Sequence, residues 1–319
     1  MMHPDTIQRL REFRNELYML FGKRADALFE LCDAAITAGL SPSTAYLSLE
    51  TVHRRGWGSL YAALAKGQID TELLRSLLSS HRLEGGQPIY AVDTSAWPRC
   101  AAETSPERAF YHHSSRHMKG KPVVAGWAYQ LIAQVSFERD SWTAPLDAQR
   151  VHPREDTEAV AVRQIKALLT CLPAQEGVPL FLFDTGYNSV ALAEGLKDTP
   201  VAILVRLRCG RCFYGDPPAL TRTGRTGRPF RHGAKMAFKD PTTWPEPTEE
   251  HTEQDGQYGT VRVRAWSGLH AVPRDHPTKG TLGPRPSPGA RDRDPGRGNP
   301  SARLDAQAPV ALAVLLREG

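Results

Sequence analysis

The chain has 319 residues, 40% of them hydrophobic and 24% charged, which suits a folded protein of two or three structural units. Its five cysteines are odd in number and scattered, which argues against a disulfide-stapled secreted scaffold and favours a reducing, cytoplasmic setting. The net charge of +5 is modestly basic, and no apolar run approaches the roughly 20 residues of a membrane span.

Residues 5–80 carry the periodicity of α-helices. Ile7, Leu10, Phe13 and Leu17 recur at spacings of three and four, and similar patterns follow until Gly85 and Gly86 interrupt them. We therefore predict an all-helical N-terminal domain over residues 1–85. Its ten basic and ten acidic side chains leave it without net charge.

From residue 88 onward the pattern changes to short apolar runs that are typical of strands. They occupy residues 88–93, 108–113, 122–137, 179–184 and 200–207. A helix over 156–169 precedes the fourth run, and a second over 188–196 follows it. The order of three strands, helix, strand, helix and strand predicts an α/β fold, with an antiparallel meander leading into parallel strands.

Positive charge is concentrated after the last of these runs. Between Arg206 and Lys235 there are eight basic side chains and one acidic one. Such a cluster is suited to a polyphosphate partner, although a solvated loop is the alternative interpretation. The candidate contact residues are Arg206, Arg208, Arg211, Arg222, Arg225, Arg228 and Arg231.

The end of the chain differs in composition from the rest. No Phe, Trp or Tyr follows Trp266, and residues 277–300 are rich in glycine and proline. We predict that residues 273–319 are disordered, because such a segment cannot bury enough apolar surface to fold. A short apolar stretch, 308–316, closes the chain.

Two aspartates stand at the ends of apolar runs. Asp93 ends Ile-Tyr-Ala-Val-Asp, and Asp184 ends Leu-Phe-Leu-Phe-Asp. Taken singly, an aspartate after a strand is more often a turn former or a helix cap. As a pair they can face one crevice at the ends of neighbouring strands, where two carboxylates repel each other unless a cation lies between them. A divalent metal is the natural partner of such a pair.

The local sequences around both aspartates resemble motifs of bacterial insertion-sequence transposases with an Asp-Asp-Glu triad (DDE transposases, of the IS-four superfamily type). The stretch Tyr90–Arg99, Tyr-Ala-Val-Asp-Thr-Ser-Ala-Trp-Pro-Arg, resembles the first-aspartate motif. The stretch Leu182–Ser189, Leu-Phe-Asp-Thr-Gly-Tyr-Asn-Ser, resembles the second. The resemblance extends over roughly residues 1 to 273, and residues 121–134 also contribute to it.

The resemblance implies an RNase H-like catalytic core over 86–208 and a basic, β-rich insertion over 209–272. It also implies metal-dependent cleavage and joining of double-stranded DNA, with Mg²⁺ or Mn²⁺ bound in a two-metal site. Asp93 would bridge the two ions and Asp184 would hold one of them. The partners implied are the ends of the mobile element and its target DNA, bound by a possible homodimer, with Arg99 and Lys121 assisting near the site.

The third acid of the triad is not found in the sequence. The family carries it as a glutamate on a helix, and the acids beyond residue 272 have no helical pattern around them. We therefore expect weak or absent activity from a chain that is C-terminally truncated or frameshifted, and we interpret its tail as an out-of-frame translation.

Two other functions remain open, a non-catalytic DNA-binding protein and an RNase H-like nuclease of another kind. DNA binding by the helical N-terminal domain is also possible. Trp97 and Trp127 are expected in the core, and the Cys209–Cys212 pair lacks the further ligands of a structural zinc site.

Overall fold

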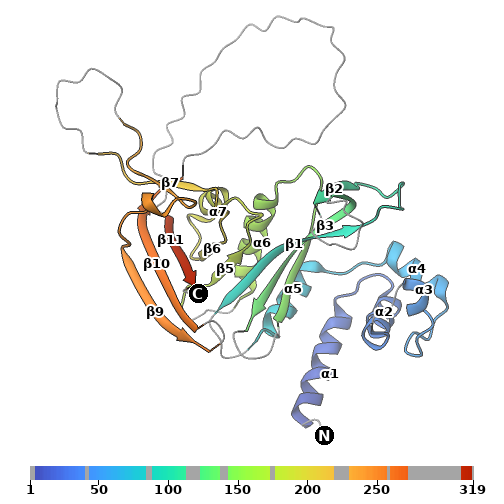
Figure 1. The fold of residues 1–319 in the computed structure, drawn as a ribbon. Coiled ribbons are helices and arrows are strands. Elements are labelled where there is room, and N and C mark those ends of the chain that lie inside the picture. The colour runs from blue at the N-terminus through green and yellow to red at the C-terminus, as the bar shows by residue number, and fades with distance from the viewer. Residues whose placement is uncertain are drawn as a thin grey trace, which may run out of the picture. The chain divides into compact units, whose positions relative to one another are not determined.

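The computed structural model describes residues 4–39, 43–83, 88–112, 123–136, 143–172, 177–218, 230–256, 259–271 and 310–317. The chain divides into two compact units (Figure 1). Unit 1 comprises residues 1–187 and 198–205, and unit 2 comprises residues 188–197 and 206–319. The helical stretch and the central sheet therefore belong to one unit. The predicted boundaries at residues 85 and 208 stay a prediction.

The N-terminal part of unit 1 is helical in its described residues, as its periodicity predicts. Local signals explain where helices begin: Asp70 accepts hydrogen bonds from the backbone N–H groups of Glu72 and Leu73 and so caps the last of the five. The helices are α1 (Pro4–Met19), α2 (Ala25–Thr37), α3 (Thr44–Leu47), α4 (Trp57–Lys66) and α5 (Thr71–Ser80). No described helix has both the length and the apolar character needed to cross a membrane.

The central sheet of unit 1 contains parallel and antiparallel strands. Strand β1 pairs antiparallel with β3 and parallel with β5, and β5 pairs parallel with β6. This is an RNase H-like arrangement, a meander that leads into parallel strands, and it confirms the predicted fold class. The strands are β1 (Ile89–Pro98), β2 (Ala109–His112), β3 (Val123–Val135), β4 (Thr143–Val151), β5 (Leu180–Phe183) and β6 (Ala202–Val205).

Strand β4 was not among the predicted strands. The antiparallel meander consists of β1, β3 and β4, whereas the sequence predicted that the run over 108–113, which contains β2, would be one of its three strands. Both β2 and β4 pair with β3, at different parts of its length. The sequence of β4 disguises it, because Pro145 and Asp147 are rare within strands. The register of β4 against β3 shifts at this point and leaves Leu146 as an extra, fully buried residue. A bulge of this kind is where a sheet tolerates proline.

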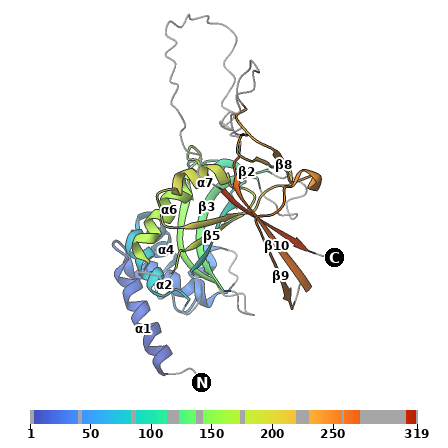
Figure 2. The same cartoon turned by 90° about the vertical axis from the view of Figure 1, so that its left-hand side faces the viewer.

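Helix α6 (Thr157–Cys171) covers one face of the sheet (Figure 2) and contacts β4 and α5. Asp156 caps it by accepting a hydrogen bond from the Ala159 N–H, as the sequence predicts. Its buried face includes Val160, Ile165 and Leu168. The second predicted helix is α7 (Ser189–Leu196), which Asn188 caps by accepting from the Val190 N–H.

Unit 2 is rich in strands and has its own small core of Phe213, Met236, Trp266 and Leu269. It forms a two-stranded and a three-stranded sheet, the latter in the order β11-β10-β9. In addition to α7, its elements are β7 (Cys212–Tyr214), β8 (Lys235–Ala237), the 3₁₀ helix η1 (Pro241–Thr243), β9 (Glu249–Asp255), β10 (Gly259–Leu269) and β11 (Val310–Arg317). Strands β7 to β10 lie where the β-rich insertion is predicted.

The end of the chain departs from the predicted disorder. Residues 310–317 form β11, which pairs antiparallel with β10, whereas residues 272–309 lie outside the described residues. The run Val-Ala-Leu-Ala-Val-Leu-Leu is apolar and partly β-branched, so it can complete the hydrogen bonds of an open strand edge.

Candidate active site

Asp93 lies on the less covered face of strand β1. The side chains of Tyr90 and Val92 are buried, and because successive strand residues point to opposite faces, Asp93 projects away from that buried layer. The Tyr90 ring stacks on Phe181 of β5 with centroids 5.1 Å apart, which ties the two strands together beneath the site. Asp93 is exposed to solvent.

Asp184 follows the last residue of β5 and takes the position beside Asp93. The parallel register pairs Tyr90 with Phe181 and Val92 with Phe183, so the next residue on each strand is an aspartate. Neighbouring strands are about 5 Å apart. Val92 and Phe183 are both buried, and the alternation of side chains directs both carboxylates to the opposite face. The structure thus brings the two aspartates together at one place, and both are exposed.

A tight turn orients the Asp184 carboxylate. The Gly186 N–H donates a hydrogen bond of 2.7 Å to Asp184 Oδ1. A Cβ at position 186 would lie 2.9 Å from that same oxygen, so any other residue there would displace the Asp184 carboxylate from this position. Oδ1 is therefore held by the backbone, and Oδ2 remains available to a cation or to water.

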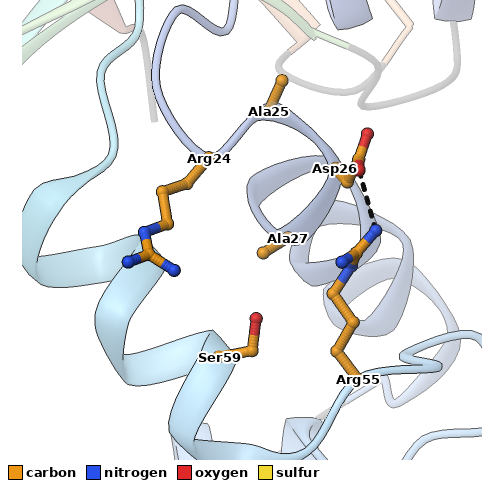
Figure 3. A pocket seen from close by; sticks show the side chains of 6 residues that line it. All are labelled: Arg24, Ala25, Asp26, Ala27, Arg55 and Ser59. Atoms are coloured by element: carbon orange, nitrogen blue, oxygen red, sulfur yellow. Dashed lines mark hydrogen bonds and ion pairs between the residues drawn. The ribbon is translucent and has the colours of Figure 1, made fainter.

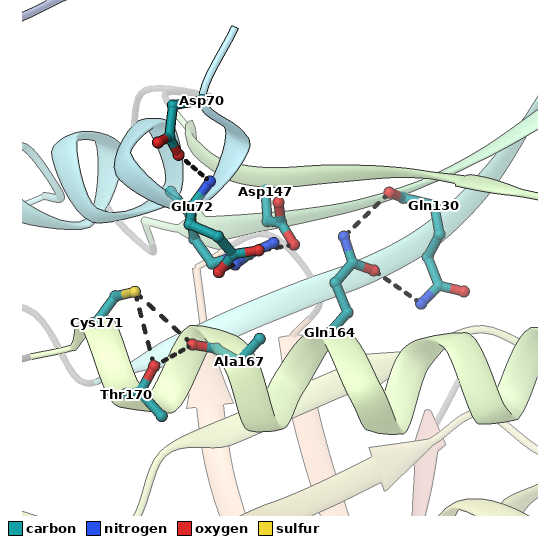
Figure 4. A network of polar contacts seen from close by, with 9 residues as sticks. Asp70, Glu72, Gln130, Asp147, Gln164, Ala167, Thr170 and Cys171 are labelled. Atoms are coloured by element: carbon teal, nitrogen blue, oxygen red, sulfur yellow. Dashed lines mark hydrogen bonds and ion pairs between the residues drawn. The ribbon is translucent and has the colours of Figure 1, made fainter. Parts of the chain in front are cut away.

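A buried polar network lies next to the aspartates. The Tyr187 hydroxyl is 2.8 Å from Thr94 Oγ1 and donates to Gln130 Oε1 at 3.4 Å. The Gln130 amide donates in turn to Gln164 Oε1 on α6, at 3.0 Å (Figure 4). Both glutamines are fully buried. The network joins β1, β3, α6 and the turn after Asp184, and sequence reasoning did not identify it.

The electrostatics of Tyr187 report on the charges around it. Burial raises the pKa of the Tyr187 phenol, the hydrogen bond with Thr94 opposes this, and the negative charges of Asp93 and Asp184 add to the increase. Glu158 contributes in the same direction, and its effect is the smallest of those that act on Tyr187. Because burial, and then the charges of both aspartates, favour the neutral phenol, Tyr187 stays protonated and serves as a neutral support for the pair.

No third acidic or metal-binding side chain joins the pair in the part of the chain that the structure describes. None of the described His, Cys, Asp or Glu residues form a group of three or more that could hold a metal ion. The acidic residues between 272 and 309, which the sequence makes poor candidates for the third acid of the triad, lie outside the described residues.

The basic residues fall into three sets. Arg206, Arg208, Arg211 and Arg231 are exposed and belong to unit 2, and Arg222, Arg225 and Arg228 lie outside the described residues, as does Lys121. The Arg99 guanidinium lies over the ring of Trp97, 5.0 Å from its centroid. Trp97 is not the core residue that we expected, because it is 55% exposed.

A pocket of about 320 Å³ lies elsewhere, between α2 and α4 (Figure 3). Its lining is polar and includes Arg24, Ser59 and the ion pair of Arg55 with Asp26, which are 2.8 Å apart. Neither Asp93 nor Asp184 lines it. We therefore place the candidate active site at the aspartate pair rather than at this pocket.

Comparison with known families agrees with the fold. The sequence matches the family described as DDE superfamily endonuclease over residues 16–272. No curated protein matches the chain. The match covers both aspartates, all of the central sheet and most of the β-rich region. The chain therefore belongs to the DDE superfamily of endonucleases.

Proposed function

We propose that this protein is a DNA transposase of the insertion-sequence type, which cleaves and joins DNA strands with Asp93 and Asp184 as its metal ligands. The observation that carries the proposal is the parallel register of β1 and β5, which sets the two aspartates side by side in a DDE-family chain. A DDE endonuclease acts on DNA, so its substrate supplies phosphodiester groups.

The donor atoms at the pair fit a hard divalent cation. Two exposed carboxylates on adjacent strands repel each other, and a cation between them removes that cost. Carboxylate oxygens are the ligands that Mg²⁺ and Mn²⁺ prefer. The bound metal supplies Lewis-acid stabilisation to a phosphodiester undergoing attack. The chain's own part is to hold Asp184 Oδ1 through Gly186 and to keep the supporting Tyr187 neutral.

We further propose that the activity of this chain is weak. A two-metal site needs more carboxylate ligands than two, and the described residues bring no third one to the pair. The interpretation of the tail as an out-of-frame translation of a truncated gene stays a prediction.

Binding of Mn²⁺ tests the metal site directly. Asp184→Asn keeps an Oδ1 that can accept from Gly186 but removes the negative charge, so we expect Mn²⁺ affinity to fall by more than about tenfold. Loss of an outer-shell partner alone costs about 10- to 100-fold. The signal of free Mn²⁺ in electron paramagnetic resonance measures the affinity. The matched control is Asp198→Asn, at another exposed aspartate of unit 1, which should bind as the wild type does. Equal affinity in all three proteins would rule out the site.

DNA contacts are proposed for the arginine cluster of unit 2. The four described members, Arg206, Arg208, Arg211 and Arg231, are exposed, and the structure shows no ion pair for them among the described residues. Each arginine that neutralises a phosphate releases a counterion, which makes binding strongly dependent on salt.

Salt titration of DNA binding tests this cluster. The logarithm of the DNA-binding constant falls linearly with the logarithm of the salt concentration. Alanine at these four positions should make this slope shallower by about 0.9 for each arginine that contacts a phosphate. Fluorescence anisotropy of a labelled duplex gives the slope. Lys239→Ala, which removes an exposed basic residue of the same unit outside the cluster, should leave it unchanged. If the fourfold variant keeps the wild-type slope, these arginines do not bind DNA.

A non-catalytic DNA-binding protein is the second candidate, and the absence of a third acid from the described residues favours it. Such a protein would bind DNA equally well with and without a divalent metal. A general RNase H-like nuclease is the third; unlike a transposase, it would not prefer terminal repeats over random duplex.

We also propose that the protein acts in the cytoplasm at the nucleoid, as a homodimer on element ends and target DNA.

A further inference from the structure

Aromatic and arginine side chains form a strip on unit 1 that the proposed metal site does not use. It consists of Trp97 on β1, Trp127 and Tyr129 on β3, Arg99 just after β1, and Arg150 on β4. The Arg99 guanidinium lies 5.0 Å from the Trp97 ring centroid and 5.7 Å from that of Trp127, and Arg150 lies 5.1 Å from the Trp127 ring centroid. The Trp97 and Tyr129 rings meet edge to face at 6.1 Å.

The strip shares a face of the sheet with Asp93. On β1 the residues 93, 95 and 97 alternate with the buried side, and the antiparallel register sets Ser95 opposite Tyr129 and Trp97 opposite Trp127. Helix α6 covers the other face, where Gln130 contacts Gln164. Trp97 lies four residue steps beyond Asp93 along β1, which is about 13 Å or four base-pair steps of duplex DNA.

The side chains of the strip differ in how many hydrogen bonds and ion pairs hold them in place. The Trp127 indole donates to the Pro106 carbonyl at 3.1 Å, and Arg150 is paired with Glu107 at 3.3 Å. The Trp97 indole donates no hydrogen bond to any described residue, and the residue is 55% exposed. An exposed aromatic ring on a strand can stack on the flat face of a nucleobase, and the guanidinium beside it can bind a phosphate.

The charge of the strip also suits a DNA strand. Arg99, Arg108 and Arg150 lie along it, and the carboxylate of Glu107 pairs with Arg150. Arg108 donates to the backbone carbonyls of Arg99 and Cys100, at 2.9 and 3.0 Å, and so fixes the turn that carries Arg99. Aromatic rings that stack bases beside arginines that meet phosphates are the usual elements of single-strand binding.

We propose that Trp97 stacks an unpaired nucleobase of the DNA strand whose phosphodiester lies at the aspartate pair, with Arg99 meeting an adjacent phosphate. The proposal deepens the proposed function, since it takes DNA as the substrate. It adds that the DNA is bound with at least one base out of the duplex on this side of the cut.

The test compares two DNAs, a fully paired duplex and the same duplex with a short 3′ single-stranded extension that contains 2-aminopurine. The full-length protein is used in EDTA, so that binding does not depend on the metal site. Wild-type protein should quench the 2-aminopurine fluorescence by stacking. Trp97→Ala should abolish the quench and weaken binding of the extended DNA about tenfold, which is within the usual effect of one stacked base. Affinity for the paired duplex should not change.

Two controls separate stacking from folding. Trp97→Phe keeps an aromatic face and should retain most of the quench. Trp57→Ala removes an indole that is also exposed, at 69%, but lies on α4, and it should behave as the wild type. If Trp97→Ala binds both DNAs as the wild type does, or loses both equally, the proposal is overturned. Asp93→Asn should leave the quench intact, so a failure of the metal site and a failure of the strip give different results.

Discussion

Replacing Asp93 by Asn should reduce metal-dependent nicking of supercoiled DNA to the level seen without protein. The substitution preserves the shape of the side chain and removes one of the two negative charges beside which a cation would bind. Removal of a single electrostatic stabiliser of a transition state typically costs a factor of at least about a hundred. Because the wild-type activity is itself expected to be low, the assay requires Mn²⁺ and a long incubation. A supercoiled plasmid is a sensitive substrate, since a single nick converts the whole plasmid to its open-circular form.

The stability of this variant is the internal control. In the metal-free protein Asp93 and Asp184 repel each other, so Asp93→Asn should melt at the wild-type temperature or above it. Loss of nicking together with a lower melting temperature would indicate damage to the fold instead. Nicking that persists at the wild-type rate would remove Asp93 from the site. Robust strand transfer by the wild type that vanishes in Asp93→Ala would contradict the proposal that the chain is impaired.

Replacing Arg75 by Ala should destabilise unit 1 by about 3–5 kcal/mol, the usual cost of leaving one charge of a buried ion pair without its partner. Arg75, on α5, is 2% exposed, and its Nε lies 3.1 Å from Asp147 Oδ2 on β4, whose side chain is 7% exposed. Figure 4 shows Asp147 pointing toward the helix that carries Glu72, which also pairs with Arg75. This contact ties the N-terminal helices to the sheet.

Urea denaturation followed by circular dichroism measures the loss, and hydrogen exchange of the α5 and β4 peptides assigns it to this contact. Arg163→Ala is the matched control: Arg163 is 56% exposed and pairs with Glu155, so its loss should cost no more than about 1 kcal/mol. The double variant Arg75→Met with Asp147→Leu should recover most of the stability, because it leaves no unpaired charge. A small effect of Arg75→Ala would show that α5 is held to β4 mainly by its apolar contacts.

Much of the fold could be predicted from short stretches of sequence. The helix caps at Asp70, Asp156 and Asn188 are local hydrogen bonds between a side chain and the next turn, so they are visible in the sequence itself. The runs that become β1 and β5 are uniformly apolar because both strands lie inside the sheet. The same runs identified Asp93 and Asp184 as a candidate pair.

Other elements depend on partners that are distant in the chain. Strand β4 contains Pro145 and Asp147, and it is a strand because β3 accepts it with a bulge and Arg75 neutralises its aspartate. Strand β11 lies forty residues beyond β10, and only its pairing with β10 shows that residues 310–317 form a strand.

The amino-acid sequence alone therefore determined the helical start, the strand-rich core, the two acidic positions and the basic cluster, because each depends on neighbours a few residues away. The tertiary structure decided that Asp93 and Asp184 are adjacent, that Tyr187 and Gln130 support them from within, and that Trp97 is exposed. Each of these depends on strand register and on which face of the sheet α6 covers, and no short stretch of sequence carries that information.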